Sequence, residues 1–389
     1  MFKKTAPDWR TIGVASLAPL VPSMTVVTLG MSLPEIRGAL SLSEIEAGSL
    51  FTAIFVLAVG ASAVAGRLSD GIGRKAVLVI GIIFLSAGFA LSALGRTYPA
   101  MLALLAIAGL GYGFTTPSLF ALMSDLLPGR RGLAASLVSS SYGVGGLLGP
   151  LVASWFIAKA GWKASFLAVG LIGATIATLE AIMIKCALAR PVAREAPSGR
   201  RKINRIVALL ALAEFFGGSV FWSTASWTPT VLRTTKELAV SETGLVMAVW
   251  GITPMIGAIL FGPLSDRFSR KSVILWTAFP GALAAFVVYH TLTSPEALAV
   301  GLIIFGTLKA TVPTLIIALA QDSVAAETVG AASGVVMSMH YVAAVVAPLI
   351  AAQLIAGTGN MVLSMILTSS VPLVIYGGLI ATVPEKPRA

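Results

Sequence analysis

The sequence has few of the side chains that most enzymes use for chemistry. Among 389 residues there are one cysteine, Cys186, and two histidines, His290 and His340. A single cysteine excludes a disulfide within the chain, and the sequence contains neither an H-E-x-x-H zinc motif nor a phosphate-binding P-loop. We therefore expect no metal site, no cofactor and no enzymatic activity, and nothing supports an ATP-driven pump.

Charged residues are also scarce. Only 11% of the residues are charged and 57% are hydrophobic, whereas about a quarter of a soluble globular protein is charged. Apolar stretches of about 20 residues recur, and each can cross a hydrocarbon core of about 30 Å. Such spans must be helices or barrel strands, and stretches such as 76–94 lack the alternation of barrel strands. We place twelve helical spans at residues 11–35, 45–65, 76–95, 99–123, 133–158, 164–187, 206–229, 242–262, 272–290, 297–320, 331–356 and 361–383.

The net charge is +11, and the basic residues behind it are distributed according to the topology of these spans. With a cytoplasmic N-terminus, most Lys and Arg side chains fall in cytoplasmic segments, which is the positive-inside bias of membrane proteins. The basic excess therefore indicates membrane orientation and no nucleic-acid partner. We expect both termini in the cytoplasm, and the first apolar stretch is too long for the core of a cleavable signal peptide.

The chain contains an internal repeat. The charged loop 66–75 returns as 262–271, with six of ten positions identical at an offset of 196 residues. Residues 117–119 also match 313–315, and 149–153 match 347–351. The basic segment 190–205 is predicted to be a cytoplasmic linker between two six-helix bundles at 1–189 and 206–389. Internal repeats with a substrate site at their interface are common in secondary transporters.

The repeated loop resembles the signature between helices 2 and 3 of the major facilitator superfamily. The resemblance implies two pseudo-symmetric six-helix bundles, with helices 1, 4, 7 and 10 around a central cavity that opens to each side in turn. It also implies a conformational latch, weakened here by departures at Gly71 and Ser269; the alternative is a pair of ordinary positive-inside turns. By position the latch residues are Gly66, Asp70, Gly73, Arg74 and Lys75, with Asp266, Arg270 and Lys271 in the second copy.

The fifth span carries a second resemblance. Gly145, Gly149 and Pro150 lie in a run that looks like the helix 5 motif best known from proton-coupled drug antiporters of this family. Close helix packing is the alternative explanation, because glycines let helix backbones approach in lipid. Leu105 stands where the antiporter pattern has an arginine, which counts against drug export.

Charges within the spans are candidate functional groups, because each costs about 3 kcal/mol to insert. Glu214 in the seventh span and Lys309 in the tenth lie at similar depths, so we expect them to form a charge pair facing the cavity. A structural pair is the alternative. His340 in the eleventh span reaches a similar depth and either relays protons or packs as a hydrogen-bonded histidine. In the sixth span, Lys185 is expected to reach the lipid headgroups, and Glu180 either pairs with Lys185 or faces the bundle interior, so both are expected to be structural.

Three uncharged side chains are candidate pocket residues, namely Tyr112, Thr116 and Trp222. Together these features predict an all-α secondary active transporter that moves a small organic solute, either a metabolite or an organic anion, by alternating access with proton coupling. Proton-coupled efflux of drugs or amphipathic compounds is the alternative, and a non-transporting receptor is a third possibility. The expected setting is a monomer in the lipid bilayer of a prokaryotic inner membrane.

Overall fold

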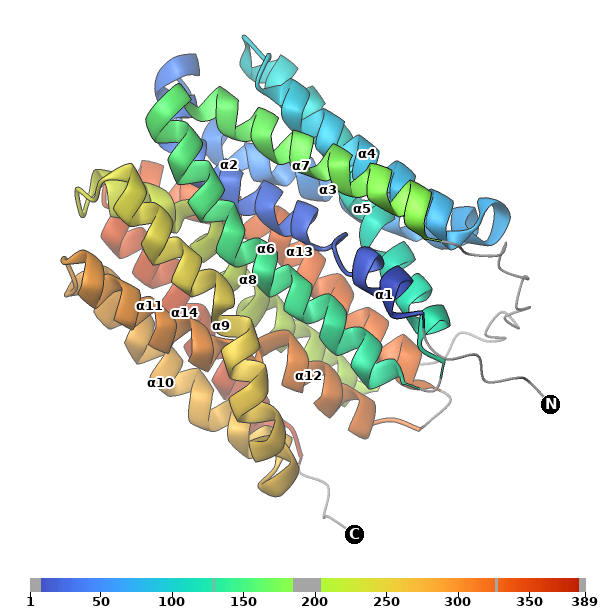
Figure 1. The fold of residues 1–389 in the computed structure, drawn as a ribbon. Coiled ribbons are helices and arrows are strands. Elements are labelled where there is room, and N and C mark those ends of the chain that lie inside the picture. The colour runs from blue at the N-terminus through green and yellow to red at the C-terminus, as the bar shows by residue number, and fades with distance from the viewer. Residues whose placement is uncertain (1–7, 129, 185–203, 326–327, 385–389) are drawn as a thin grey trace. The chain divides into compact units, whose positions relative to one another are not determined.

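The computed structural model describes residues 8–128, 130–184, 204–325 and 328–384. These residues fold into helices and turns, with no strand among them (Figure 1). Twelve helical stretches are long and apolar enough to cross a membrane, and their bounds agree with the predicted spans to within a few residues. The all-helical fold with twelve spans is confirmed.

The first six spans contain seven helices, because the first span is broken between Ala15 and Leu20. These helices are α1 (Trp9–Ala15), α2 (Leu20–Leu40), α3 (Glu44–Ile72), α4 (Arg74–Ser92), α5 (Tyr98–Leu126), α6 (Arg131–Ala160) and α7 (Trp162–Met183).

The last six spans also contain seven helices, because the tenth span is broken after Lys309. They are α8 (Arg205–Thr234), α9 (Val240–Arg267), α10 (Arg270–His290), α11 (Pro295–Lys309), α12 (Thr311–Asp322), α13 (Val329–Thr358) and α14 (Met361–Thr382).

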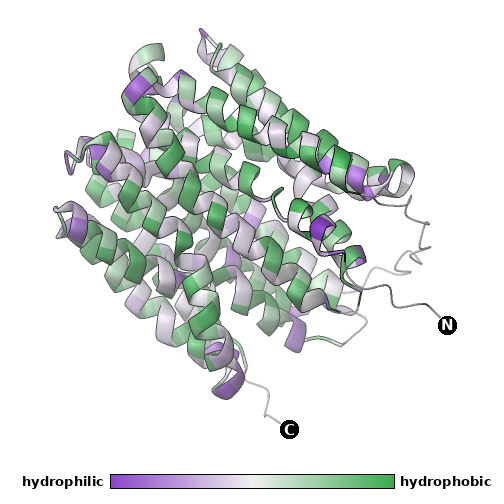
Figure 2. Ribbon diagram, in the orientation of Figure 1, coloured by the Kyte–Doolittle hydropathy of each residue, from purple (hydrophilic) through white to green (hydrophobic). Residues whose placement is uncertain are grey.

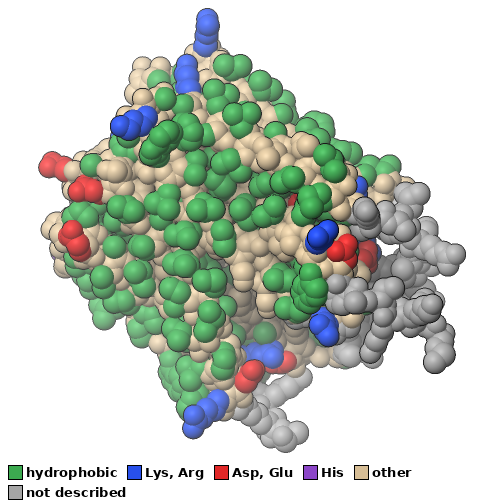
Figure 3. Space-filling model, viewed as in Figure 1, with side chains coloured by type: hydrophobic (Ala, Val, Ile, Leu, Met, Phe, Trp, Pro, Cys, Tyr) green, Lys and Arg blue, Asp and Glu red, His purple; other side chains and the backbone are tan. Residues whose placement is uncertain are grey.

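The helix surfaces suit a lipid environment. Large apolar side chains such as Leu171, Ile182 and Ile259 are about two-thirds exposed or more, and hydrophobic residues run along the helices in Figure 2. Figure 3 shows apolar side chains over most of the visible helix surface, with charged side chains gathered toward its margins. Contact of such apolar surface with lipid tails is favourable, whereas its exposure to water is costly.

The described helices group into two compact units. Unit 1 contains Met1–Leu29 and Ala53–Ala196, and unit 2 contains Gly30–Thr52 and Pro197–Ala389. The grouping therefore assigns the connection between α2 and α3 to unit 2, although it precedes the predicted linker in sequence. Residues 185–203 lie outside the described part of the chain, and Arg205 is already the first residue of α8. The division into bundles at 1–189 and 206–389 stays a prediction.

Close backbone contacts hold the Gly30–Thr52 segment within unit 2. A Cβ at Gly30 would lie 2.5 Å from the Ala225 carbonyl oxygen, so only glycine allows this approach. Thr52 Oγ1 donates a hydrogen bond to the Val345 carbonyl oxygen at 2.8 Å. An ion pair of 2.6 Å joins Arg233 Nη1 to Glu35 Oε1. Small residues and interhelical polar contacts are the usual basis of helix association in lipid.

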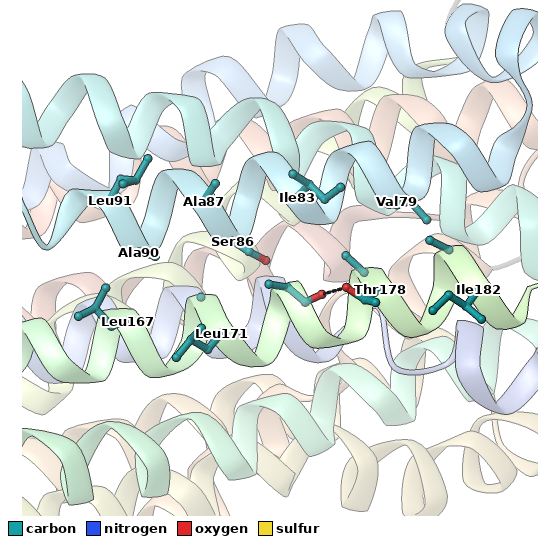
Figure 4. Close-up of a pocket in the computed structure, with 14 residues that line it drawn as sticks. Val79, Ile83, Ser86, Ala87, Ala90, Leu91, Leu167, Leu171, Thr178 and Ile182 are labelled. Carbon is teal, nitrogen blue, oxygen red and sulfur yellow. Dashed lines mark hydrogen bonds between the residues drawn. The ribbon is translucent and has the colours of Figure 1, made fainter.

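In unit 1, α4 and α7 pack side by side and leave an apolar groove between them (Figure 4). At one end of this pair, the rings of Phe89 and Phe166 stack with their centroids 4.1 Å apart. The groove is lined by apolar side chains with Ser86 and Thr178, and Thr178 donates its hydroxyl to the Ala174 carbonyl oxygen at 2.8 Å. No charged residue lines it, so it is not the candidate site for a charged substrate.

Candidate functional site

The candidate site is a buried polar cluster in unit 2, built around Glu214 on α8. Glu214 is fully buried, and its Oε1 lies 2.7 Å from Nδ1 of His340 on α13. Its second oxygen, Oε2, is buried without a hydrogen-bond partner among the described residues. The structure therefore joins two predicted site residues in a carboxylate–imidazole pair, an arrangement in which a proton can be held or released.

Glu214 and Lys309, the expected charge pair, make no direct ion pair in the structure, although the two charges interact electrostatically. Within the described part of the chain, Lys309 forms no ion pair or hydrogen bond, although the residue is only 5% exposed. Its Nζ instead lies 4.2 Å from the ring centroid of Phe221 and 5.9 Å from that of Trp250. The electron-rich ring faces attract the ammonium group, so aromatic side chains rather than a carboxylate surround this charge.

A break in the tenth span positions Lys309. Val312 has φ −64° and ψ 159°, the extended conformation to which a following proline, here Pro313, restricts a residue. Pro313 lacks a backbone N–H and cannot donate to the Lys309 carbonyl oxygen four residues earlier, so the span is kinked at the start of α12. Lys309 occupies the last turn of α11, where the partial negative charge of the helix end favours a cation.

Two residues on α8 complete the cluster. A Cβ at Gly218 would lie 2.9 Å from His340 Nδ1, so the missing side chain gives His340 room to reach Glu214. The ring centroid of Trp222, a predicted pocket residue, lies 5.6 Å from that of His340, and Trp222 is 4% exposed. Phe221 and Gly218 were not predicted, because an apolar residue and a glycine carry no signal within an apolar helix.

The other predicted pocket residues belong to unit 1. Thr116 Oγ1 and the Tyr142 hydroxyl are 3.0 Å apart, and Tyr142 is the repeat counterpart of His340. Tyr112 is 8% exposed and meets the ring of Phe55 edge-on, with centroids 5.3 Å apart. Unit 1 thus has an uncharged polar pair where unit 2 has a carboxylate and an imidazole.

The first repeated loop is tied to the ends of neighbouring helices. Arg74 Nη1 donates to the Ala121 carbonyl oxygen at 2.8 Å and forms an ion pair with Asp125, both on α5. Lys75 Nζ donates to the Ala181 carbonyl oxygen on α7 at 2.7 Å. Cations near a helix C-terminus satisfy its free carbonyls and its partial negative charge.

The second loop makes the same contacts in unit 2. Arg270 Nη1 donates to the Ala318 carbonyl oxygen at 2.5 Å and pairs with Asp322 Oδ2 at 2.6 Å, both on α12. Lys271 Nζ donates to the carbonyl oxygens of Ala381 and Val383, at 2.9 and 2.7 Å. Each arginine therefore anchors its loop within its own unit.

Of the two acidic latch residues, the structure describes the side chain of Asp266. Asp266 is exposed and forms no ion pair with any described residue, and the side chain of Asp70 lies outside the described residues. The latch itself, a contact that differs between conformations, stays a prediction.

The two loops differ at one backbone position. Gly73 has φ 92°, a region that favours glycine, whereas a Cβ at Gly66 would meet nothing within 4 Å. Ser269, the counterpart of Gly73, is extended at φ −166° and accepts a hydrogen bond from the Ser272 N–H at 3.0 Å. The serine therefore caps α10, and its backbone has no need of glycine.

The helix 5 glycines pack α6 closely against α2 in unit 1. A Cβ at Gly145 would lie 2.8 Å from the Leu20 carbonyl oxygen, and one at Gly149 would lie 3.1 Å from Met24 Cα. Pro150 lies inside α6. Close packing explains both glycines and leaves the antiporter interpretation as a proposal.

The sixth span holds a further buried acid in unit 1. Glu180 on α7 is fully buried, and neither carboxyl oxygen has a hydrogen-bond partner among the described residues. Its expected partner, Lys185, lies outside the described residues, so this pairing stays a prediction.

Comparison with known proteins supports a transporter. A family model described as the Major Facilitator Superfamily matches residues 15–348 and 207–389. The chain is 27% identical to a putative metabolite transport protein of Haemophilus influenzae, over 76% of each chain. It is 27% identical to the gallate transporter of Pseudomonas putida, over 69% of this chain and 68% of the relative. A 3-(3-hydroxy-phenyl)propionate transporter of Escherichia coli is 24% identical, over 95% of this chain and 92% of the relative.

Solved structures show the same fold. An inward-facing, unoccupied bacterial homolog of the human lysosomal transporter Spinster superimposes with a TM-score of 0.78 at 16% identity, over 97% of both chains. A D-xylose-proton symporter superimposes with a TM-score of 0.77 at 16% identity, over 95% of this chain and 97% of the symporter. With twelve apolar spans, the repeated loop and the family match over nearly its whole length, the chain belongs to the Major Facilitator Superfamily and is a membrane-embedded secondary transporter of small organic solutes.

Proposed function

We propose that the protein moves small organic acids across the membrane by alternating access and couples this movement to protons. The observation that carries the proposal is the buried Glu214–His340 pair, with its 2.7 Å contact, in the same helical unit as the Lys309 ammonium. A buried carboxylate beside an imidazole provides a place for a proton. A buried ammonium that forms no direct ion pair with a carboxylate of the described residues provides a place for an anion.

Charge compensation links the two binding events in this proposal. A charge in the membrane interior is costly unless it is paired, so an organic anion beside Lys309 lowers the cost of keeping that ammonium buried. A proton on the Glu214–His340 pair changes the charge of the same cluster. Both ligands therefore shift the equilibrium between conformations through their different affinities for each one.

The relatives agree with an acid as substrate. Their printed names include transporters of gallate and 3-(3-hydroxy-phenyl)propionate and a probable sulfoacetate transporter, and all three substrates are organic acids. The proposal includes a monomer without enzymatic activity or a nucleic-acid partner, in a prokaryotic inner membrane with both termini in the cytoplasm. The bacterial relatives and the positive-inside distribution of Lys and Arg support this setting.

The test is uptake into proteoliposomes that contain the purified chain. We expect saturable uptake of radiolabelled 3,4-dihydroxybenzoate, or of another acid from an aromatic and aliphatic panel, when the outside is more acidic than the lumen. A protonophore should abolish accumulation, and protein-free liposomes provide the control for passive entry. Flux of none of the acids would contradict the proposal, as would accumulation that ignores the pH gradient.

Proton-coupled efflux of amphipathic compounds is a second candidate. The observation in its favour is the close packing of α6 on α2 at Gly145 and Gly149, within a run that resembles the motif of drug antiporters. Reversing the pH gradient in the same vesicles distinguishes the two functions. An antiporter accumulates a dye such as ethidium when the lumen is acidic, whereas an acid symporter does not.

A further inference from the structure

We propose that Lys309, Phe221 and Trp250 form a subsite for planar, unsaturated carboxylic acids and discriminate against saturated ones. This inference rests on the proposed transport of organic acids and narrows its substrate class. The subsite lies at the end of α11, where the tenth span breaks, and takes its rings from α8 and α9.

The charge of Lys309 is available to a ligand. An ammonium has three hydrogen-bond donors, and within the described residues Lys309 uses none of them for an ion pair or hydrogen bond, while its Nζ lies 4.2 Å from the Phe221 ring centroid. A substrate carboxylate can therefore form a charge-assisted hydrogen bond without displacing an acid of the protein. If Lys309 formed a direct ion pair with Glu214, the substrate carboxylate would have to displace Glu214.

The rings beside the charge favour a flat ligand. Phe221 and Trp250 are stacked, with centroids 5.3 Å apart and planes 26° from parallel. Trp222 meets Phe221 edge-on, with centroids 4.9 Å apart. Aromatic groups gain energy from offset stacking and edge-to-face contacts beyond the apolar area they bury. A planar substrate ring whose carboxylate meets Lys309 can make these contacts, whereas a puckered saturated ring cannot.

Two buried polar atoms in the cluster suit ring hydroxyls. Trp250 Nε1 and Glu214 Oε2 are both buried without a hydrogen-bond partner among the described residues, and Trp250 is 4% exposed. Leaving such groups unpaired is costly. A hydroxylated planar acid offers an acceptor to the indole N–H and a donor to the carboxylate, so hydroxylation should strengthen binding.

The competing explanation gives Lys309 a structural role. A cation in the last turn of α11 is favourable without any ligand, and its contact with Phe221 then serves packing. That explanation predicts that substitutions at Lys309 and Phe221 change stability but leave the preference for planar over saturated acids unchanged.

The experiment measures binding of a matched pair of acids to the purified full chain in detergent by titration calorimetry. The pair is 3,4-dihydroxybenzoate and its saturated counterpart, 3,4-dihydroxycyclohexanecarboxylate. We expect the wild type to bind the planar acid about tenfold more tightly, the upper range for one aromatic contact. Phe221→Leu should remove most of that preference, measured as the ratio of the dissociation constants of the two acids. Phe216→Leu, on the same helix outside the cluster, is the control.

Substitutions at Lys309 test the charge. Lys309→Gln should weaken binding of both acids by about ten- to a hundredfold, as expected for loss of a charged hydrogen bond, and Lys309→Arg should restore much of it. Thermal unfolding checks that each variant is folded, and Trp250→Leu replaces Phe221→Leu if the latter unfolds.

The outcomes separate this inference from the proposed function. Equal binding of the two acids by the wild type overturns the inference, as does a planar preference that survives the loss of Phe221 or Trp250, or binding of neither acid. Gradient-driven uptake of an aliphatic acid would still support the proposed function in each of these cases. Absence of gradient-driven uptake of every acid overturns the proposed function, whatever the binding shows.

Discussion

The two halves of the chain agree at the ends of their spans and differ in the middle. Arg74 contacts Ala121 and Asp125 on α5, and Arg270 makes the equivalent contacts with α12 in the second half. Both lysines that follow these arginines cap a helix C-terminus. The duplicated framework has kept its helix-end anchors in both copies.

The middles have diverged in charge. At the offset of 196 residues, Lys309 corresponds to Gly113, and at 198 residues His340 corresponds to Tyr142. The neutral Tyr142 contacts Thr116 on the fourth span, whereas its counterpart His340 contacts the carboxylate of Glu214 on the seventh span. The difference indicates that the scaffold is shared by both halves, whereas the charged chemistry is concentrated in unit 2.

The backbone also differs between the fourth span and its repeat, the tenth span. Pro117 lies inside the continuous helix α5, whereas its counterpart Pro313 lies near the start of α12, directly after the extended Val312. Both prolines lack a backbone donor, so the proline alone does not decide whether a span breaks. In unit 2 the break coincides with the buried Lys309.

The largest difference between the halves should appear when the carboxylate in the middle of unit 2 is neutralised. Glu214→Gln keeps the shape of the side chain but removes its ability to exchange a proton with His340. We expect gradient-driven accumulation in proteoliposomes to fall by about a hundredfold, the upper range for loss of a hydrogen bond to a charged group. Exchange of substrate between equal pools needs no net proton movement and should persist. Normal accumulation at every pH would remove Glu214 from the coupling mechanism.

Gly218→Ala tests the geometry of the same pair without removing either titratable group. The new Cβ would lie 2.9 Å from His340 Nδ1, so His340 must move away from Glu214. We expect gradient-driven transport to fall by about tenfold, as for an energetic loss of about 1.4 kcal/mol. Gly334→Ala, on α13 where a Cβ meets nothing within 4 Å, is the matched control. Equal activity of the two variants would contradict the positioning role of Gly218.

Tyr142→Phe tests whether the Thr116–Tyr142 pair in unit 1 contributes as much to transport as the Glu214–His340 pair in unit 2. The substitution removes the hydroxyl that lies 3.0 Å from Thr116 Oγ1. A neutral hydrogen bond contributes about 1 kcal/mol, so we expect initial transport rates to fall by no more than about fivefold. A loss as large as that of Glu214→Gln would show that the halves share the coupling chemistry.

Arg74→Gln and Arg270→Gln should have the smallest effects, and these effects should match. Each arginine side chain is between a quarter and a third exposed, at 26% and 29%, and partly exposed ion pairs contribute up to about 1 kcal/mol. We expect similar small decreases in the thermal unfolding temperature of the two variants in detergent. A large decrease in only one of them would show that the two loops are anchored differently.

The sequence predicted the spans and the depth of the charges because both depend on position along the chain. Hydropathy over about 20 residues locates each span, and 1.5 Å of rise per residue places Glu214 and Lys309 at similar depths. Depth does not give the direction in which a side chain points around the helix. The structure turns Glu214 toward α13 and Lys309 toward Phe221, so depth alone does not identify the direct contacts of either charge.

Features that depend on packing left no signal in the sequence. Gly218 is one of 39 glycines, and only its distance from His340 gives it a role in the site. The kink in the tenth span lies at Val312 and Pro313, and the repeat counterpart of Pro313 lies in an unbroken helix. Tertiary contacts therefore decide which glycine and which proline contribute to the site.

The assignment of Gly30–Thr52 to unit 2 bears on what a cut between the two halves of the chain would do. A polypeptide severed within 190–205 would leave one fragment lacking the residues that oppose Ala225 and Val345. The C-terminal fragment could regain these contacts only by associating with the N-terminal fragment. Residues on both sides of 190–205 in sequence therefore contribute to unit 2, so two fragments cut there would need to associate to keep these contacts.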